Sequence, residues 1–259
     1  MKIFVIGLGN MGEAIVRRLA SLKSVYDIYA ADKNISKLQK SEREYGTKSD
    51  SSYTDLDNAD FIILAVKPQD FESLATEIKD RISKNAILLS IAAGVSISKI
   101  QKLFGHDKIV RAMPNIGLRV EQGITVWKSA NLGAEDTENA KKLLSDISGN
   151  FEAKSEDLLD AVTAISGSGP AYFFYLAQAL EKSAVNLGIS ADEASQLVRK
   201  TLSAAAALQD DKSYDELIKE VASKGGTTEA ALKTLEAQGF ALAVEKAVRA
   251  AEARAKEIS

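Results

Sequence analysis

DAVTAISGSGPAY, Asp160–Tyr172, is the stretch at which this sequence changes character. Before it, apolar runs alternate with amphipathic segments, a pattern typical of alternating strands and helices. After it, nearly every segment has helical periodicity. Two glycines interrupt the stretch, and Pro170 suits the first turn of a new helix because it lacks an N–H and its φ is fixed. We interpret the stretch as the joint between an α/β half and a helical half, although a kinked linker between two packed helices would have the same local pattern.

Composition excludes several classes of protein. The chain has 259 residues, 33 basic and 36 acidic, and its net charge of −3 gives no basic field for nucleic acid. There is no cysteine and only one histidine, so we expect neither disulfides nor a metal centre. No run approaches the roughly 20 apolar residues of a membrane span, and the first residues enter a strand pattern rather than a signal peptide. We therefore expect a soluble cytosolic protein that does not bind membranes.

A glycine-rich motif stands between the first strand pattern, Lys2–Ile6, and a helical pattern that starts at Glu13. Its residues are Gly7, Leu8, Gly9, Asn10, Met11 and Gly12. In this context Gly-x-Gly-x-x-Gly indicates a dinucleotide site, because the glycines permit a tight turn, close approach of a pyrophosphate and close packing of helix on strand. The pyrophosphate would bind the free N–H groups at the helix N-terminus. A glycine-rich turn without a ligand is the alternative.

The end of the second expected strand, Tyr26–Ala31, bears on the choice of cofactor. Asp32 follows it, 20 residues after Gly12, where a carboxylate hydrogen-bonds the ribose 2′-hydroxyl of NAD and repels a 2′-phosphate. Lys33 comes next and could pair with that phosphate. The prediction leans toward NADH and leaves NADPH open. A turn or helix-capping role for Asp32 is the alternative.

Three further apolar runs should be parallel strands, and ligands collect at the carboxyl ends of such strands. The runs are Phe61–Val66, Ala86–Ile91 and Ile109–Ala112. The expected cofactor-lining residues at the first two ends are Ala65, Val66, Lys67, Pro68, Ile91, Ala92 and Ala93. Each end could also be an ordinary tight loop. We expect His106 at a surface turn and Trp127, in a late strand, to serve packing.

The second half should be helical. Ser190 with Glu193 and Ser213 with Glu216 each have the form of a capping box before a helix. The last helix should run from Glu229 to Ile258 with apolar residues at helical spacing. So much apolar surface predicts dimerisation, with burial inside one chain as the alternative. The expected domains are a Rossmann-type dinucleotide-binding domain, 1–153, and an all-helical domain for substrate binding and dimerisation, 154–259.

The segment Gly225–Thr228 is the second candidate site. Two glycines before a helix expose several backbone N–H groups in one direction, which suits a carboxylate, and Thr227 and Thr228 add hydroxyl groups. The local pattern alone favours a simpler interpretation, in which one of the threonines is the helix N-cap.

With these motifs placed, the chain resembles the pyrroline-5-carboxylate reductases over essentially its whole length. The residues that carry the resemblance are Gly7–Gly12, Ala65–Pro68, Ala92–Val95, Arg111–Asn115, Asp160–Tyr172, Gly225–Thr228 and Leu235–Phe240. The resemblance implies hydride transfer from NADPH or NADH to C5 of a cyclic imine, giving proline. It also implies a homodimer formed by the helices and, in many members, a ring of five dimers.

The resemblance also assigns roles to individual residues. Thr228 would bond the substrate ring nitrogen, and backbone N–H groups of Gly226, Thr227 and Thr228 would bind its carboxylate. Glu156 matches an acidic residue near the substrate. Glu220 stands where the family often has an asparagine near the substrate, and Ser52 stands where an asparagine contacts the adenosine ribose.

Several positions depart from the family pattern. Besides Glu220 and Ser52, the sequence has Lys224 for a proline, Ile116-Gly117 for Thr-Pro, and Ala241 for an arginine. These departures bear on substrate affinity and identity more than on the fold.

Other functions remain open at this stage. A β-hydroxyacid-type dehydrogenase would carry a lysine early in the helix after the joint, and here none occurs before Lys182. A related imine, such as the six-membered homologue, would fit the same motifs. A non-enzymatic protein that only senses the cofactor is the third possibility.

Overall fold

The computed structural model describes residues 1–22, 25–209 and 211–257. The chain forms two compact units. The first comprises Met1–Gly167 together with the C-terminal residues from Ala251 onward, and the second comprises Ser168–Ala250.

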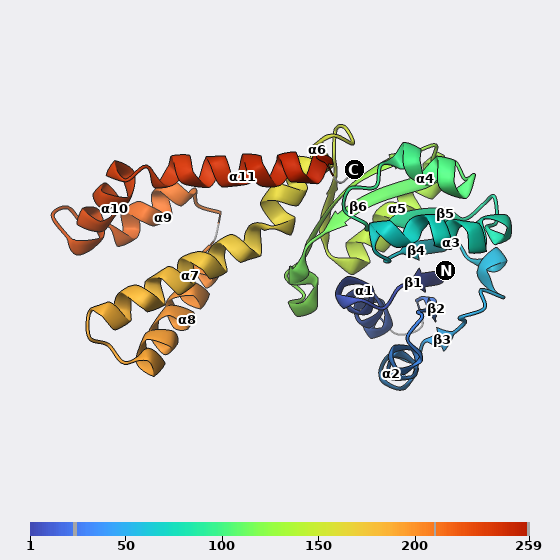
Figure 1. The fold of residues 1–259 in the computed structure, drawn as a ribbon, viewed down its shortest axis with the longest axis horizontal. Helices are drawn as coiled ribbons and strands as arrows, with labels where there is room; N and C mark the ends of the chain where they lie inside the picture. The colour runs from blue at the N-terminus through green and yellow to red at the C-terminus, as the bar shows by residue number, and fades with distance from the viewer. Residues whose placement is uncertain (23–24, 210, 258–259) are drawn as a thin grey trace. The chain divides into compact units, whose positions relative to one another are not determined.

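The first unit is built on one sheet with the strand order β3-β2-β1-β4-β5-β6-β7-β8 (Figure 1). All neighbouring strands pair in parallel except β6 and β7, which are antiparallel. The strands are β1 Lys2–Ile6, β2 Asp27–Ala31, β3 Lys48–Ser49, β4 Phe61–Leu64, β5 Ile87–Ser90, β6 Ile109–Pro114, β7 Ile124–Ala130 and β8 Gly149–Glu152. Because β1 lies between β2 and β4, the strand order reverses at its carboxyl end, where open α/β sheets bind ligands.

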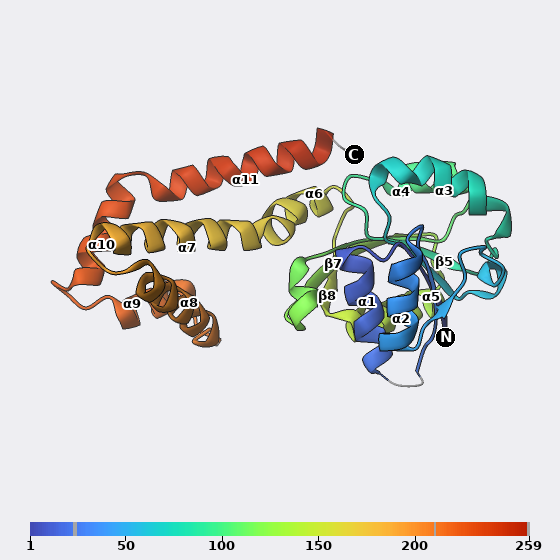
Figure 2. The ribbon, with the colours of Figure 1, turned by 60° about the horizontal axis from the view of Figure 1, so that its bottom comes forward.

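Helices cover both faces of this sheet (Figure 2). On one face lie α1 Asn10–Ser21, α2 Ile35–Tyr45 and α5 Ala134–Ile147, and on the other lie α3 Phe71–Ile78 and α4 Ile97–Phe104. Short 3₁₀ helices join the elements: η1 Leu56–Asn58, η2 Pro68–Asp70, η3 Lys79–Arg81 and η4 Ile116–Val120. The central strands are buried on both faces, which explains their continuous apolar sequences.

The joint has the form that the sequence predicts. Helix α6, Leu158–Val162, passes into a π-helical turn, η5 Thr163–Gly167, and α7 then runs from Gly169 to Asn186. Pro170 occupies the first turn of α7. A Cβ on Gly167 would lie 3.3 Å from Cε of Met113, so this glycine lets the turn pack closely against β6.

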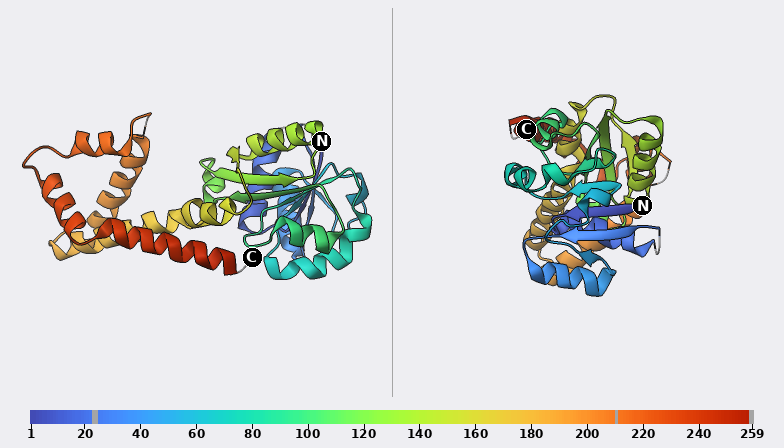
Figure 3. Two further views of the ribbon diagram at one scale, coloured as in Figure 1. Left: turned by 90° about the horizontal axis from the view of Figure 1, so that it is seen from above. Right: turned by 90° about the vertical axis from the view of Figure 1, so that its right-hand side faces the viewer.

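The second unit is entirely helical in its described residues. Its helices are α7, α8 Ala191–Ala207, α9 Tyr214–Val221, α10 Thr227–Ala237 and the first part of α11 Phe240–Glu257. Helices α7 and α8 pack side by side (Figure 1), and Figure 3 shows the helices of this unit in two further views. Both predicted capping boxes, at Ser190 and Ser213, are present. These observations confirm the predicted fold class.

Two sequence predictions need correction. The last helix is not continuous, because Gly239 adopts a φ of +71° and separates α10 from α11; Ile258 lies outside the described residues. His106 is not a surface residue: it is buried, and its Nε2 lies 2.7 Å from the carbonyl oxygen of Ala86. Trp127 is buried in the core, as predicted.

The described helices include none that is both long and apolar enough to cross a bilayer. In the same residues, no three His, Cys, Asp or Glu side chains group in a way that would hold a metal ion.

Candidate active site

A cleft of about 460 Å³ lies in the first unit, at the carboxyl ends of β1, β2 and β4. Its lining residues come from the end of β1 and the glycine-rich turn, from the end of β2 through the first turn of α2, from the residues that follow β4, from the β3–β4 connection and from η2 and α3. They are Ile6, Gly7, Gly9, Ala31, Asp32, Lys33, Lys37, Tyr53, Ala65, Val66, Lys67, Gln69, Asp70, Ser73, Leu74 and Glu77.

The glycine-rich turn has the shape that a dinucleotide requires. A Cβ on Gly12 would lie 1.9 Å from the carbonyl oxygen of Gly7, and a Cβ on Gly7 would lie 2.7 Å from that of Ala65, so both positions exclude any side chain. Gly7 also has a φ of +100°. Around Gly9, by contrast, a Cβ would have nothing within 4 Å. That open space adjoins the N-terminus of α1, where backbone N–H groups suit a pyrophosphate, and the residues therefore fit the cofactor.

Asp32 lies in the cleft with both carboxylate oxygens bonded. Its Oδ2 accepts from the backbone N–H of Leu8 at 2.6 Å and lies 3.7 Å from Nζ of Lys37. Its Oδ1 accepts from the N–H of Asn34 at 2.8 Å. Asp32 therefore fixes the glycine-rich turn to the end of β2, and it also presents a carboxylate to the cleft.

Two lysines stand beside Asp32. Lys37, in the first turn of α2, pairs with Asp32, whereas Lys33 pairs with Asp70 at 3.6 Å. Both ion pairs are long, and the lysine side chains are well exposed, so each pair contributes little to the stability of the fold. A bound ligand can therefore replace the carboxylate as the partner of either lysine. Lys33 was predicted from the sequence and Lys37 was not, although its place in the first turn of the helix after β2 was an available signal.

The remaining predicted cofactor residues divide into two groups. Ala65, Val66 and Lys67 line the cleft, and Pro68 begins η2 directly after them. The other group does not line the cleft and consists of Leu8, Asn10, Met11, Gly12, Ser52, Ile91, Ala92 and Ala93. Ala92 is buried, and its N–H lies 3.3 Å from Oγ of Ser90. The Ser52 carbonyl accepts from Arg81 at 2.7 Å.

Tyr53 also lines the cleft, although the sequence did not predict it as a site residue. It belongs to the irregular connection between β3 and β4, which has no periodicity to mark it. Its φ is +56°, an uncommon conformation for a bulky residue. Burial raises the pKa of its hydroxyl, and the nearby carboxylates of Glu77, Asp32 and Asp50 raise it further.

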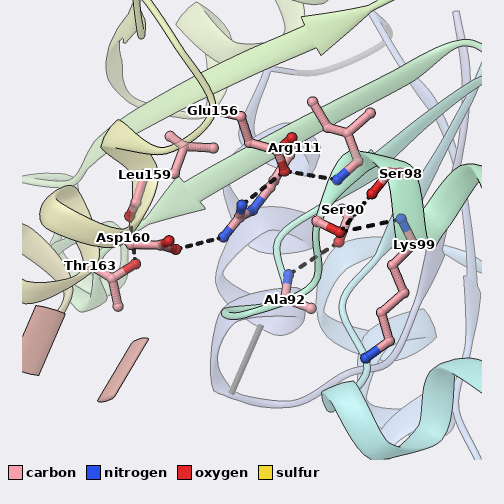
Figure 4. A network of polar contacts seen from close by, with 11 residues as sticks. Ser90, Ala92, Ser98, Lys99, Arg111, Glu156, Leu159, Asp160 and Thr163 are labelled. Carbon is pink, nitrogen blue, oxygen red and sulfur yellow. Dashed lines mark hydrogen bonds and ion pairs between the residues drawn. The ribbon is translucent and has the colours of Figure 1, made fainter. Parts of the chain in front are cut away.

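Glu156 takes part in a network around the buried Arg111 of β6 (Figure 4). Arg111 donates to Oε1 of Glu156 at 2.9 Å and to Oδ1 of Asp160 at 3.0 Å. The same Oε1 accepts from the N–H of Ile97, at the start of α4, at 2.8 Å. The network joins β6, α4 and the start of α6. Removing either carboxylate would leave the buried guanidinium of Arg111 partly uncompensated, so this network should be costly to break.

In the second unit, the loop before α10 contains the other predicted substrate residues. Gly226 is the N-cap of α10, so neither Thr227 nor Thr228 serves as the cap and that simpler interpretation is wrong. In the described part of the chain, neither threonine hydroxyl forms a hydrogen bond. The N–H of Gly225, however, donates to the carboxylate of Glu229, whose pKa is lowered by Lys233 and by that N–H. Glu220, on α9, pairs with Lys212 at 2.7 Å.

The fold and the cleft define the class: a Rossmann-type dinucleotide-binding protein with a helical second unit. Comparison with known families agrees. Residues 2–94 match the model of the coenzyme F420-dependent NADP oxidoreductases, and residues 156–258 match the model of pyrroline-5-carboxylate reductase dimerisation.

Individual relatives are similar over the full length. The pyrroline-5-carboxylate reductase of Pseudomonas aeruginosa is 34% identical, covering 100% of this chain and 97% of that protein. The structure of the Coxiella burnetii enzyme has a TM-score of 0.90 at 34% identity and covers 99% of this chain and 98% of its own. That of Plasmodium falciparum pyrroline carboxylate reductase with NADP bound has a TM-score of 0.84 at 27% identity, covering 100% and 98%. The chain belongs to the pyrroline-5-carboxylate reductase family.

Proposed function

We propose that the chain reduces 1-pyrroline-5-carboxylate to proline. The observation that carries the proposal is the preserved phosphate cradle of Gly7, Gly9 and Gly12 in a chain that matches this family from end to end. The cofactor, when bound, supplies the hydride that C5 of the imine receives. The C=N double bond becomes a single bond, and the ring nitrogen keeps its proton. A protonated imine is already a strong electrophile, so the protein's task is to position the reactants and exclude water.

The proposed division of labour follows the two parts of the sequence. Residues 1–153 bind the cofactor, and residues 154–259 bind the substrate and form the dimer. In the loop before α10, the N–H groups of Gly226, Thr227 and Thr228 bind the substrate carboxylate, and the Thr228 hydroxyl bonds the ring nitrogen. The free threonine hydroxyls and the N-cap position of Gly226 support this assignment. Glu156 would contact the substrate through Oε2, because Ile97 and Arg111 both donate to its other carboxylate oxygen, Oε1.

The cleft is proposed to accept both NADH and NADPH. Asp32 faces the ribose end with a carboxylate, which favours the free 2′-hydroxyl of NADH. Lys33 and Lys37 line the same end, and their weak ion pairs can open to meet a 2′-phosphate. These opposing charges should keep the discrimination between the cofactors small.

The helical unit is proposed to form a homodimer. Among its described residues, the only apolar ones that are buried are Ala194 and Val198, together with Gly169. Large side chains of α7 are exposed instead: Phe173, Phe174, Tyr175, Leu176 and Leu180. Apolar side chains clustered in this way on an exposed helix mark an interaction surface, and a second copy of the family's dimerisation region would cover them. A ring of dimers, which the resemblance implies, is the proposed larger assembly.

The test of the reaction is an assay of cofactor oxidation with pyrroline-5-carboxylate, run in parallel with its six-membered homologue. Turnover at least tenfold more efficient with the five-membered imine supports the proposal. Higher efficiency with the homologue would assign the chain to that substrate, and binding of cofactor without turnover of either imine would make it a cofactor-sensing protein.

A further inference from the structure

We propose that Tyr53 forms the adenine-binding wall of the dinucleotide cleft and that Asp50 is the residue that positions it. The proposal deepens the proposed function and rests on it only in one respect, that the cleft binds a dinucleotide. Tyr53 and Asp50 would act at the end of the cleft opposite the nicotinamide ring.

The location follows from the order of groups in the cofactor. The pyrophosphate belongs at Gly9, and the adenosine ribose belongs at Asp32, at the end of β2. The adenine, attached to that ribose, must lie on the far side of Asp32 from the glycine-rich turn. Outside the glycine-rich turn, the cleft is also lined by Tyr53 and by Leu74 and Glu77 of α3, and the carboxylates of Glu77 and Asp32 are close enough to the Tyr53 hydroxyl to raise its pKa. An aromatic ring and a leucine suit the flat apolar faces of a purine, and a carboxylate suits its exocyclic amino group.

The ring of Tyr53 is supported from one side. It packs against Phe4, a fully buried residue of β1, with ring centroids 6.2 Å apart and an interplanar angle of 37°. Since Tyr53 also lines the cleft and is only partly buried, its ring has protein on one side and open space on another. A base can therefore pack on a ring that is already fixed, which lowers the entropy lost on binding.

The backbone at Tyr53 is held in an unfavourable conformation. A φ of +56° costs free energy for any residue with a Cβ and is usually taken by glycine or asparagine. The surrounding turn enforces it through Asp50, a buried residue whose own N–H donates to Ala30 of β2 at 3.0 Å. The Asp50 carboxylate accepts from the hydroxyl of Thr54 at 3.1 Å and from the N–H of Asp55 at 2.9 Å. These bonds clamp both sides of Tyr53, so the turn presents its side chain to the cleft.

The backbone conformation provides a clean test. Glycine is more favourable than tyrosine at a φ of +56°, so Tyr53→Gly removes the ring without straining the turn. Tyr53→Phe keeps the ring and removes the hydroxyl. Asp50→Asn loses one acceptor of the clamp. Tyr29→Ala is the matched control, because Tyr29 also stacks on Phe4, at 5.9 Å, but is not a lining residue of the cleft.

The measurement is calorimetric binding of two cofactor fragments, AMP and nicotinamide mononucleotide, to the full chain. Tyr53→Gly should raise the Kd of AMP about tenfold or more, the order of effect of losing one base–aromatic contact, and leave that of nicotinamide mononucleotide unchanged. Tyr53→Phe and Tyr29→Ala should stay within about twofold of the unmodified chain. Asp50→Asn should raise the Kd of AMP by a smaller factor than Tyr53→Gly does, and it should leave the Kd of nicotinamide mononucleotide unchanged.

The outcomes separate this proposal from the proposed function. If Tyr53→Gly binds AMP as tightly as the unmodified chain, or if it raises the Kd of both fragments equally, Tyr53 does not form an adenine-binding wall. The reductase assignment stands in either case. If the unmodified chain binds neither fragment and no intact cofactor, the cleft is not a dinucleotide site and both proposals fail.

Discussion

Asp32 shows how one residue can serve structure and specificity together. Its carboxylate fixes the N–H of Leu8 and pairs with Lys37, yet it also lines the cleft, where we propose that the cofactor ribose binds. Removing the carboxylate takes away the group that opposes a 2′-phosphate. Removing the ammonium of Lys37 takes away a group that attracts one.

We predict opposite shifts for these two variants. Asp32→Ala should raise the ratio of kcat/KM for NADPH to that for NADH about three- to tenfold, and Lys37→Met should lower it by a similar factor. Steady-state kinetics with both cofactors measures the ratio. An unchanged ratio in both variants would make the Asp32–Lys37 pair purely structural and leave Lys33 as the residue that sets the preference.

Thr228 is predicted to act on the imine nitrogen. Thr228→Val, which keeps the shape but loses the hydroxyl, should lower kcat about ten- to a hundredfold. Thr228→Ser should retain most of the activity, and the Kd of the cofactor should be unchanged in both. Equal kcat in the valine variant and the unmodified chain would remove the hydroxyl from the mechanism.

Glu229 is predicted to repel the substrate carboxylate, because its own carboxylate is held at the N–H of Gly225, next to the three N–H groups that are proposed to bind the substrate. Glu229→Gln should lower the KM for the imine about two- to fivefold without changing kcat. The matched control is Glu216→Gln, which alters the same kind of capping contact at the start of α9. A KM that rises in Glu229→Gln would show instead that the glutamate helps to order the loop for the substrate.

At the scale of elements, the sequence predicts secondary structure best for the elements that are most deeply buried. The fully apolar strands and the glycine-rich turn were predictable because each has its own local signature. The two-residue strand β3 and the edge strand β8 were missed, since neither has an apolar run. The contacts of Tyr53 and Glu229 were also not predictable, because they depend on backbone turns and side-chain directions rather than on periodicity.

Helices α1 and α2 are joined by a contact whose pH dependence can be predicted. Glu13 of α1 pairs with Lys40 of α2 and also accepts from the hydroxyl of Tyr45 at 3.1 Å. The hydrogen bond from Lys40 lowers the pKa of Glu13 below its ordinary value of 4.5. A lowered folded-state pKa stabilises the fold above the unfolded-state value, and this contribution disappears as the pH falls through the folded-state value.

Glu13→Gln should therefore lower Tm by about 1–2 °C at pH 7, and the difference from the unmodified chain should vanish as the pH falls below 4.5. Thermal unfolding followed by circular dichroism from pH 7 to pH 3 measures the difference. A difference that stays constant through this range would mean that packing, not the charge of Glu13, accounts for the effect.

At the scale of the whole molecule, the two compact units differ in how they are stabilised. The first has buried clusters on both faces of its sheet, and the second has very few buried apolar side chains among its described residues. Each large apolar side chain contributes about 1.5–3 kcal/mol when it is buried, so covering the exposed side chains of α7 with a second copy would stabilise this unit.

Phe174→Asp should therefore shift the dimer toward monomer and lower Tm, because it would place a charge in the proposed interface. The same substitution at exposed Lys102, on α4, should change neither property. Sedimentation equilibrium measures the mass of each variant. A monomer in the unmodified chain at micromolar concentration would mean that the exposed face of α7 is not an interface between copies.

The central claim is that this cleft serves hydride transfer to an imine carbon. The most direct measurement supplies the chain with nicotinamide cofactor deuterated at C4 and with 1-pyrroline-5-carboxylate, and then examines the product by mass spectrometry. The account predicts proline one mass unit heavier, with the deuterium at C5, from at least one of the two stereospecifically labelled cofactors. Absence of proline, or proline without deuterium from either labelled cofactor, would contradict it.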